Sequence, residues 1–439
     1  MVRRVETAEV RLWDQLVGAV SWQDDRGYAI FEYDPGFLRR GLDISPIHMG
    51  LDAARAGDGF FAFPELARRT YLGFPGLLAD ALPDKYGRSV IDVWLARQGR
   101  DPESFSPVER LCYTATRAMG ALEFAPPILK RKEKAQPIEI AELVALAQKI
   151  VNEREGLAVQ LGASDDGDAE AIQEILSVGT SAGGARPKAI IAVNDHGHVL
   201  SGQAEVPSDY DYWILKFDGV TDIELGEPAE YGRIEFAYYN MARLAGIEMT
   251  ECRLLEENGR AHFMTRRFDR VDGRKIHMQS LCGLAHFDFN ESGMYSYEQA
   301  FSVMRKLRLS KKDAIEQFRR MVFNVVAKNL DDHTKNIAFL MDENGDWTLS
   351  PAFDLTYAHN PAGKWTNQHQ MSINGRRENL TRQDLIAVGN SISLPKPDNI
   401  IDQVVDAVAE WPHLGKEAGV TAALIRDRVQ HHRLDLKPS

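Results

Sequence analysis

The chain has 439 residues, a formal net charge of −12, and 44% hydrophobic and 26% charged residues. This composition is typical of an ordinary globular protein, and the length is enough for about three domains. An acidic chain of this kind is not expected to bind nucleic acid through bulk charge, although a local basic patch could still do so.

The cysteines and the hydropathy narrow the class of protein further. Cys112, Cys252 and Cys282 lie far apart, so neither a disulfide framework nor a close-spaced zinc site is expected. The N-terminus lacks the apolar core of a signal peptide, and no run of 18 apolar residues is present to span a membrane. We therefore expect a reduced, cytoplasmic protein that does not contact the membrane.

Composition shifts along the chain indicate its organisation. Residues 1–127 mix strand-like and helical stretches, and the proline-rich, basic stretch 125–137 indicates a linker. The small, acidic stretch 162–171 indicates an exposed loop. From about residue 300 onward the apolar period is mostly helical, which predicts a helical C-terminal region.

Three strands and two helices can be predicted in the middle and the C-terminal half. Residues 189–193 (AIIAV) and 213–217 (WILKF) have the apolar, β-branched character of strands, and a further short strand is expected near 198–200. The apolar period of 234–245 predicts an amphipathic helix that Gly246 closes. Ser310 with Asp313 predicts a capped, longer helix that ends near Asn329.

A glycine-rich stretch, GTSAGGARPK (179–188), directly precedes the first of these strands. Three glycines and two hydroxyls within 179–184 can form a loop whose backbone N–H groups close on an anion. The Walker pattern fits only in part, because Ala185 and Arg186 stand where its lysine and hydroxyl should be. A flexible hairpin connection is the alternative interpretation of this stretch.

Lys216 lies inside an otherwise apolar strand, on the same face as Ile214. A lone lysine of this kind is often on the solvent side of an edge strand. The order of features favours function: a glycine-rich loop, a strand with Lys216 and then a helix that begins near Glu235. Protein kinases place their phosphate loop, their phosphate-binding lysine and its glutamate partner in this order.

The most informative motif is NLDDHTKN (329–336), which follows the long helix. Asp331 and Asn336 have the D-x-x-x-x-N spacing of a kinase catalytic loop, where the aspartate accepts the substrate's proton and the asparagine helps to hold Mg²⁺. A hairpin is expected to follow, with its turn at Asn344 and Gly345. It would return SPAFDL, and Asp354 within it, to a place beside Asn336. Oxygen ligands of this kind suit Mg²⁺.

Several alternatives to phosphoryl transfer remain. The motif could be a polar turn before an Asn-Gly hairpin, or Asp331, Asp332 and His333 could belong to a metal-dependent hydrolase. No H-E-x-x-H pair supports the metal-dependent hydrolase. Asp332 is a rival base for a kinase, but its spacing from Asn336 is one residue shorter. The combined order of motifs favours phosphoryl transfer.

The chain resembles the HipA family of serine/threonine-protein kinase toxins, which belong to type II toxin–antitoxin systems. The resemblance rests on TSAGGARPKA, WILKF, RIEFAYYNMARLAGI, MTRRFDR, DDHTKN and SPAFDL, in that order. It implies an α+β, bilobal protein-kinase-like fold with a small mixed α/β N-terminal subdomain and an all-helical C-terminal lobe. The implied divisions are 1–127 for the subdomain, 138–268 for the β-rich nucleotide-binding lobe and 269–439 for the mainly helical lobe.

The resemblance also implies roles for individual residues. Asp331 would be the catalytic base, Asn336 and Asp354 the Mg²⁺ ligands, and Ser181 the autophosphorylated residue, with Thr180 as a second candidate. Arg266, together with Arg267 and Phe268, would lie on or just after the segment that joins the lobes, near the adenine. The implied ATP-binding residues are Thr180, Ser181, Ala182, Gly183, Gly184, Lys188, Lys216, Glu235, Arg267, Phe268, His333 and Lys335.

The implied function is transfer of the ATP γ-phosphate to a protein hydroxyl, on an aminoacyl-tRNA synthetase of the glutamyl type, which would inhibit translation and growth. The implied cofactors are ATP and Mg²⁺. The implied partner is a HipB-like helix-turn-helix antitoxin, with DNA reached only through it. The alternatives are a kinase for a small molecule or a lipid, and a binding module without catalysis. The retained Lys216, Asp331, Asn336 and Asp354 argue against the last.

Overall fold

The computed structural model describes residues 4–57, 59–128, 135–156, 186–202, 204–220 and 230–438. The chain forms two compact units. Unit 1 contains Met1–Asp43, Met49–Gly232 and Arg253–His277, and unit 2 contains Ile44–His48, Arg233–Cys252 and Met278–Ser439. The N-terminal region and the β-rich region thus belong to one unit, and the division at 127/138 and 268/269 stays a prediction.

An antiparallel sheet of five strands, in the order β4-β3-β2-β1-β5, forms the N-terminal part of unit 1. Along β1 the burial alternates, so that Ala8, Val10 and Leu12 are buried and the residues between them are more exposed, as expected for a sheet with one face on a core. The strands are β1 (Thr7–Leu12), β2 (Gln15–Gln23), β3 (Tyr28–Tyr33), β4 (Phe60–Phe61) and β5 (Leu122–Ala125).

Short helices alternate with the strands in this part of the chain. The longest of them, α5, begins after Asp84, whose side chain accepts a hydrogen bond from the Gly87 backbone N–H, and α6 begins with a capping box of Ser106 and Glu109. The helices are α1 (Pro35–Arg40), α2 (Leu51–Ala56), α3 (Arg68–Tyr71), α4 (Gly76–Ala79), α5 (Lys85–Arg97), η1 (Pro102–Ser104) and α6 (Pro107–Thr114).

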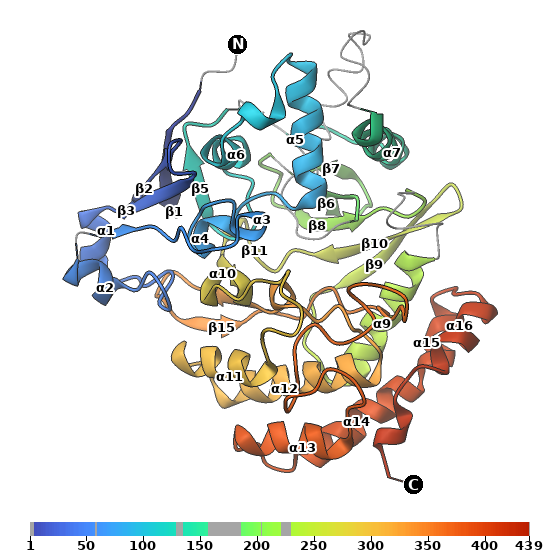
Figure 1. Ribbon diagram of the computed structural model, residues 1–439. Coiled ribbons are helices and arrows are strands. Elements are labelled where there is room, and N and C mark those ends of the chain that lie inside the picture. Colours follow the sequence, from blue (N-terminus) through green and yellow to red (C-terminus); the bar gives the residue numbers. More distant parts are fainter. Residues whose placement is uncertain are drawn as a thin grey trace. The chain divides into compact units, whose positions relative to one another are not determined.

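The second sheet of unit 1 has the order β7-β6-β8-β10-β9 and contains the strands predicted from the sequence. Trp213 and Leu215 of β8 are buried in a core with residues of α5 and α7 (Ile140–Gly156), and Lys216 belongs to the opposite face, as the alternation predicts. Figure 1 shows α5 and α7 on one side of this sheet. The strands are β6 (Lys188–Asn194), β7 (Val199–Ser201), β8 (Tyr210–Lys216), β9 (Cys252–Glu257) and β10 (Arg260–Arg266).

Unit 2 is mainly helical. The expected all-helical lobe also contains a sheet of three strands, β13-β14-β15, because the predicted hairpin pairs with a further strand. A small ribbon of β11 (Arg270–Val271) and β12 (Arg274–Lys275) precedes it in unit 1. The elements of unit 2 are α9 (Tyr231–Leu244), β13 (His277–Ser280), α10 (Leu281–Ala285), α11 (Tyr297–Lys306), α12 (Lys311–Val326), η2 (Thr334–Asn336), β14 (Ala338–Met341), β15 (Trp347–Leu349), α13 (Arg382–Ser391), α14 (Pro397–Ala409), α15 (Trp411–Glu417), α16 (Ala422–Val429) and η3 (Leu434–Leu436).

The long helix α12 forms the centre of unit 2. Ser310 and Asp313 make the predicted capping box at its start, and its apolar stripe, including Phe318 and Val322, is fully buried. The helix ends at Val326, three residues before the predicted end, so the catalytic-loop motif begins in irregular structure. Helix α9 closes as predicted, with Gly246 at a φ of 79°.

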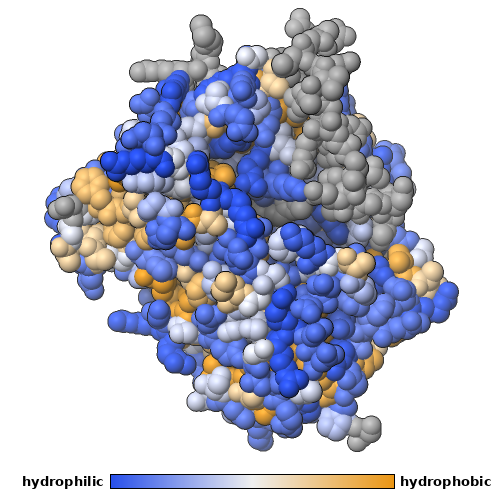
Figure 2. All heavy atoms as spheres, in the orientation of Figure 1, coloured by the Kyte–Doolittle hydropathy of each residue, from blue (hydrophilic) through white to orange (hydrophobic). Residues whose placement is uncertain are grey.

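The face in Figure 2 is largely hydrophilic, with apolar residues gathered beside α1 and α2. The exposed large apolar residues include Phe60, which is 55% exposed, and Met294, which is 63% exposed. All three cysteines are buried, and none of them forms a disulfide bond. Within the described ranges, no helix has both the length and the apolar character that crossing a membrane requires.

Candidate active site

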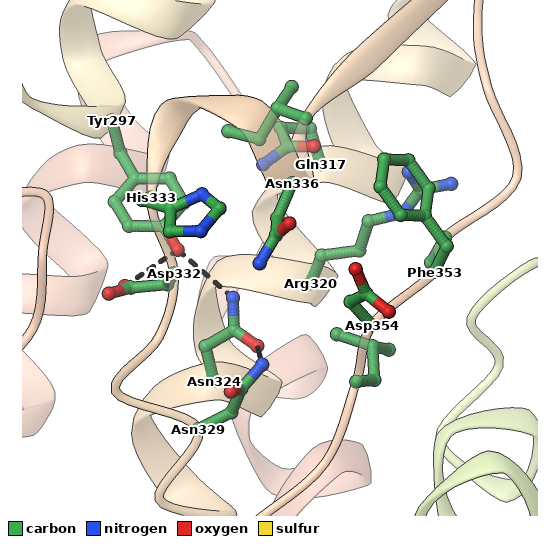
Figure 3. Close-up of a pocket in the computed structure, with 13 residues that line it drawn as sticks. Tyr297, Gln317, Arg320, Asn324, Asn329, Asp332, His333, Asn336, Phe353 and Asp354 are labelled. Carbon is green, nitrogen blue, oxygen red and sulfur yellow. Dashed lines mark hydrogen bonds between the residues drawn. The ribbon is translucent and has the colours of Figure 1, made fainter. Parts of the chain in front are cut away.

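The predicted hairpin brings Asn336 and Asp354 together. Strands β14 and β15 pair antiparallel, with Phe339 opposite Leu349, and Gly345 makes the turn with a φ of 89°. The chain enters the hairpin from Asn336 and leaves it towards Asp354. Both side chains line the same pocket, and Figure 3 shows them on opposite sides of one hollow.

The loop before the hairpin holds Asp331 at the surface. Asn336 Nδ2 donates a hydrogen bond to the backbone oxygen of Asp331 at 2.8 Å, and the Asn336 N–H bonds to the backbone oxygen of His333 at 2.9 Å. Thr334 Oγ1 anchors the loop to the Phe287 backbone oxygen at 2.6 Å. The Asp331 side chain is 48% exposed, so it can reach a substrate hydroxyl from solvent.

Asp332 has the opposite environment. It is buried, and its carboxylate accepts hydrogen bonds from Tyr297 Oη at 2.9 Å, from His369 Nδ1 at 2.8 Å and from the Gln370 backbone N–H at 2.7 Å. Burial raises the pKa of this carboxyl, but His369 and the hydrogen bonds outweigh that effect and the net pKa is lowered. Asp332 is therefore an ionised anchor, and the geometry favours Asp331 over its neighbour as the base.

Helix α12 presents polar side chains to the same pocket. Gln317, Arg320 and Asn324 lie on one face of the helix and line the pocket with Asn329 (Figure 3). Asn324 Nδ2 donates to Tyr297 Oη at 3.0 Å, and Asn329 Nδ2 donates to Asn324 Oδ1 at 2.9 Å. Our sequence analysis missed this polar face. The spacing of 317, 320 and 324 at i, i+3 and i+7 could have indicated it.

The pocket fits a hard cation. Among the described residues, Gln317 Oε1 and Asn329 Oδ1 are buried acceptors that have no hydrogen-bond partner. Asn336 and Asp354 add amide and carboxylate oxygens to the same pocket. The described part of the chain holds no group of three or more His, Cys, Asp and Glu side chains that could bind a metal. A donor set of few protein oxygens suits Mg²⁺, which keeps waters and substrate phosphates in its shell.

Two of the three lysines predicted to contact ATP lie in unit 1. Lys216 is the last residue of β8, and its Nζ lies 5.7 Å from the centre of the Phe263 ring. Lys188 is buried, and its Nζ makes an ion pair with Asp84 at 3.1 Å. No local pattern predicts this ion pair, because its two partners are 104 residues apart. Glu235 is buried near the start of α9 in unit 2, so its pairing with Lys216 stays a prediction.

The segment after β10 makes a buried ion pair. Arg267 donates to both oxygens of Asp269, at 2.9 and 2.7 Å, and Asp269 also accepts from the Gly120 N–H at 2.7 Å. Burial raises the pKa of Asp269, but Arg267 and Arg270 outweigh it and hold the pKa well below its usual value. The Arg267 guanidinium is thus bound to protein groups, and the roles predicted for it and for Phe268 near adenine stay predictions.

The remaining predicted residues are placed as follows. His333 lies with its Nε2 3.9 Å from Asp331 Oδ1, and Lys335 Nζ lies 5.1 Å from the centre of the Phe289 ring. Both therefore belong to the loop 329–336 in unit 2. The predicted ATP contacts and phosphorylation sites at 180–184 fall outside the described residues.

Two regions of the chain match known protein families. Residues 8–125 match the HipA N-terminal domain, and residues 180–411 match the HipA-like C-terminal domain. Two proteins of Sinorhizobium fredii (strain NBRC 101917 / NGR234), named "Putative kinase Y4mE" and "Putative kinase Y4dM", are 23% and 27% identical over 201 and 134 residues. The matches cover 43% and 28% of this chain, but only 41% and 32% of the lengths of those relatives.

A solved structure has a similar fold over nearly the whole chain. HipA of Shewanella oneidensis MR-1, determined in a complex with HipB and operator DNA, matches 98% of this chain and 95% of that chain, with a TM-score of 0.66 and 17% identity. The fold is therefore the α+β, kinase-like fold of HipA. Because the HipA-like C-terminal domain alone matches more than half of the residues, the chain belongs to the HipA family.

Proposed function

We propose that the chain is an ATP-dependent serine/threonine-protein kinase that acts as the toxin of a toxin–antitoxin pair. The observation that carries this proposal is the position of three side chains in and beside the loop 329–336. An exposed Asp331 follows the kinase spacing to Asn336, and Asn336 shares a pocket with Asp354. A base open to substrate beside a pair of oxygen ligands is the arrangement that phosphoryl transfer needs.

In the proposed reaction, the Asp331 carboxylate accepts the proton of a serine or threonine hydroxyl. The hydroxyl oxygen forms a bond to the γ-phosphorus of ATP, and the bond from that phosphorus to the β–γ bridging oxygen breaks, which releases ADP. Asn336 fixes the position of Asp331 through its hydrogen bond to the Asp331 backbone oxygen at 2.8 Å. When bound by Asn336 and Asp354, Mg²⁺ supplies neutralisation of the negative charge on the phosphates.

Basic side chains would also neutralise negative charge on the ATP phosphates. We propose that Lys216, at the end of β8, contacts the ATP phosphates. Lys335 and His333 would contact them from the catalytic loop. Lys188 and Glu235 support the nucleotide site, and Arg267 and Phe268 lie near the adenine. We further propose that autophosphorylation of Ser181, with Thr180 as a second acceptor, adds negative charge to the loop 180–184 and so lowers its affinity for ATP.

The partner and the substrate follow from the family in this proposal. A HipB-like helix-turn-helix antitoxin would inhibit the kinase and connect it to DNA, which is supported by the solved Shewanella HipA in its complex with HipB and operator DNA. The formal charge of −12 makes contact with DNA through a basic partner more favourable than direct contact. An aminoacyl-tRNA synthetase, of the glutamyl type, is the proposed substrate.

The experiment is a transfer assay with the full chain, γ-labelled ATP and a bacterial lysate. We expect label in a protein band with the wild-type chain and at least about a 100-fold loss of transfer with Asp331→Asn, because the base is removed. The Asp346→Asn change, at an exposed carboxylate in the hairpin turn, is the matched control and should leave transfer unchanged.

Three outcomes of the assay contradict the proposal. Label in a small molecule or lipid alone would support the alternative kinase, and absence of any transfer would support a non-catalytic binding module. Near-normal protein labelling by folded Asp331→Asn protein would remove Asp331 from the role of base.

A further inference from the structure

Unit 2 exposes two large apolar side chains near the loop that carries the proposed base. Met294 is 63% exposed and Trp365 is 38% exposed. Among the described residues of this unit, Leu244 of α9 is the only other large apolar side chain that is exposed to this extent. Single exposed apolar side chains are common on protein surfaces, so exposure alone indicates no function. The argument for Met294 and Trp365 comes from what their segments are bonded to.

A single buried residue, Gln370, connects both segments to the loop of the base. Its backbone N–H donates to Asp332 Oδ1 at 2.7 Å, and Asp332 directly follows the proposed base. Its backbone oxygen accepts a hydrogen bond from the Gly293 N–H at 2.8 Å, and its Nε2 donates to the Trp365 backbone oxygen. Gln370 is 4% exposed, and buried hydrogen bonds of this kind hold the groups that they join in place. Met294, which follows Gly293, and Trp365 therefore lie on segments that are held beside the base.

The segment before Met294 also packs directly on the loop of the base. The Phe287 backbone oxygen accepts a hydrogen bond from Thr334 Oγ1 at 2.6 Å. The centre of the Phe289 ring lies 5.4 Å from the centre of the His333 ring. The segment that exposes Met294 is thus attached to this loop by a hydrogen bond and by a ring contact.

The segment around Trp365 is basic. Residues 355–377 contain Lys364, Arg376 and Arg377 and no Asp or Glu, although the whole chain has a net charge of −12. Lys364 is exposed, and its Nζ lies 4.7 Å from the centre of the Trp365 ring. An apolar side chain that packs on Trp365 would therefore bring its neighbours close to this ammonium group. Charge favours an acidic neighbour at that place.

We propose that Met294, Trp365 and Lys364 form a docking surface for the protein substrate. This docking surface takes an extended segment in which a large apolar residue stands next to an acidic one. Tryptophan offers a large and rigid contact area, and the flexible methionine side chain adapts to different apolar partners. The inference deepens the proposed function and rests on it, because the occupant is the protein whose hydroxyl reaches Asp331.

The docking surface would position the substrate relative to the base. Gln370 is bonded both to the Trp365 backbone and to Asp332, so a segment bound at Trp365 has a defined place relative to the base. Binding energy from residues that do not react lowers the cost of bringing the hydroxyl and the base together. Loss of the docking surface should therefore raise the KM for the peptide or protein and leave the KM for ATP unchanged.

The first test measures binding without ATP, so that it does not depend on catalysis. Fluorescein-labelled serine peptides are titrated with the full chain, and the fluorescence anisotropy is recorded. One set carries Leu next to Asp at successive positions around the serine, and the matched set carries Gly and Ser there. We expect the best Leu-Asp peptide to bind about tenfold tighter than its Gly-Ser counterpart, and Trp365→Ala to remove most of that difference.

Two further variants complete the binding test. Lys364→Gln should lose the preference for Asp and keep the preference for Leu. Leu244→Ala is the matched control, since Leu244 is 58% exposed at the end of α9, and this variant should bind like the wild type. Equal binding of the two peptide sets by the wild type would overturn the proposal. Equal affinities of Trp365→Ala and Leu244→Ala for the best peptide would overturn it as well.

Transfer from γ-labelled ATP to the same peptides separates the docking surface from the kinase assignment. Trp365→Ala should raise the KM for the peptide about tenfold and leave kcat and the KM for ATP unchanged. Binding that depends on Trp365, without any transfer, would support the docking surface and contradict the proposed kinase. Transfer with the same peptide KM in the wild type and in Trp365→Ala would support the kinase and overturn the docking surface.

Discussion

Asp331 and Asp332 are neighbours in the chain, yet their environments differ completely. Asp331 is 48% exposed, whereas Asp332 is 1% exposed and has three hydrogen-bond donors. A carboxylate that is fully hydrogen-bonded and ionised cannot easily approach a substrate or take up a proton, and the exposed neighbour can do both. Asp332 therefore acts as a positioning residue, which fixes the loop that carries Asp331.

Replacing Asp332 tests this division of roles. Asp332→Asn should destabilise the chain by about 3 kcal/mol, because it leaves His369 and the other buried donors without their anion. Phosphate transfer should fall through kcat, with little change in KM for ATP, since the altered residue contacts no nucleotide. Urea unfolding and steady-state kinetics measure the two effects. Unchanged stability together with lost activity would instead make Asp332 the base.

The same residue also predicts a pH dependence. Its pKa in the folded chain lies below the usual value of 3.8, so its contribution to stability is complete above pH 3.8 and is lost as the pH falls through the lower, folded value. The wild-type chain should therefore lose stability below about pH 4 more steeply than Asp332→Asn does. Equal slopes in urea unfolding below pH 4 would contradict this assignment.

At the scale of elements, the β14–β15 hairpin determines where the ligands of the pocket lie. The turn places Gly345 at a φ of 89°, a conformation that costs other residues about 1–2 kcal/mol. The hairpin then returns the chain so that Asn336 before it and Asp354 after it reach one pocket. The geometry of the site thus depends on a turn that does not itself contact the ligand.

Gly345→Ala should destabilise the chain by about 1 kcal/mol and weaken the binding of Mg²⁺ with ATP, because the strands can no longer close the turn without strain. Glu343→Ala is the matched control, since Glu343 is an exposed residue of the same turn without a positive φ. Thermal unfolding and nucleotide titration measure the outcome. Equal effects of the two changes would show that the turn does not determine the site.

Local patterns explain which parts of the fold could be predicted. The hairpin, the capping box of α12 and the strand with Lys216 each depend on residues close in sequence, and the structure contains all three. The contacts of Asp332 with Tyr297 and His369, and the pair of Lys188 with Asp84, join distant segments. The periodicity of apolar residues does not indicate contacts between distant segments. The role of Asp332 as the anchor of the catalytic loop could therefore not be predicted.

At the scale of the whole molecule, unit 2 contains two histidines that burial keeps neutral. Burial lowers the pKa of His432 to about 4 and that of His286 to about 3. His432 lies against Tyr238, with 3.1 Å between its Nε2 and the tyrosine oxygen, and His286 stacks on His48 at 4.1 Å. Both histidines take up a proton more readily in the unfolded chain than in the folded one.

The chain should consequently lose stability as the pH falls from 6.5 towards 4. At pH 5 each of the two histidines is charged in the unfolded state and neutral in the folded state, which costs about 2 kcal/mol apiece. Urea unfolding at pH 7 and pH 5 measures this loss. His432→Gln should reduce it by about half, and His413→Gln, at an exposed histidine, should leave it unchanged. A stability that does not change between pH 7 and pH 5 would contradict the assignment.

The measurement that tests the account most directly is the intact mass of the purified full chain after incubation with ATP and Mg²⁺, for the wild type, Asp331→Asn and Asp354→Asn. The account predicts a mass gain of whole phosphate groups in the wild type, and at least about a 100-fold slower gain in both variants, each of which still folds. Phosphate incorporation at wild-type rates in either folded variant would contradict the central claim that Asp331 and Asp354 form a phosphoryl-transfer site.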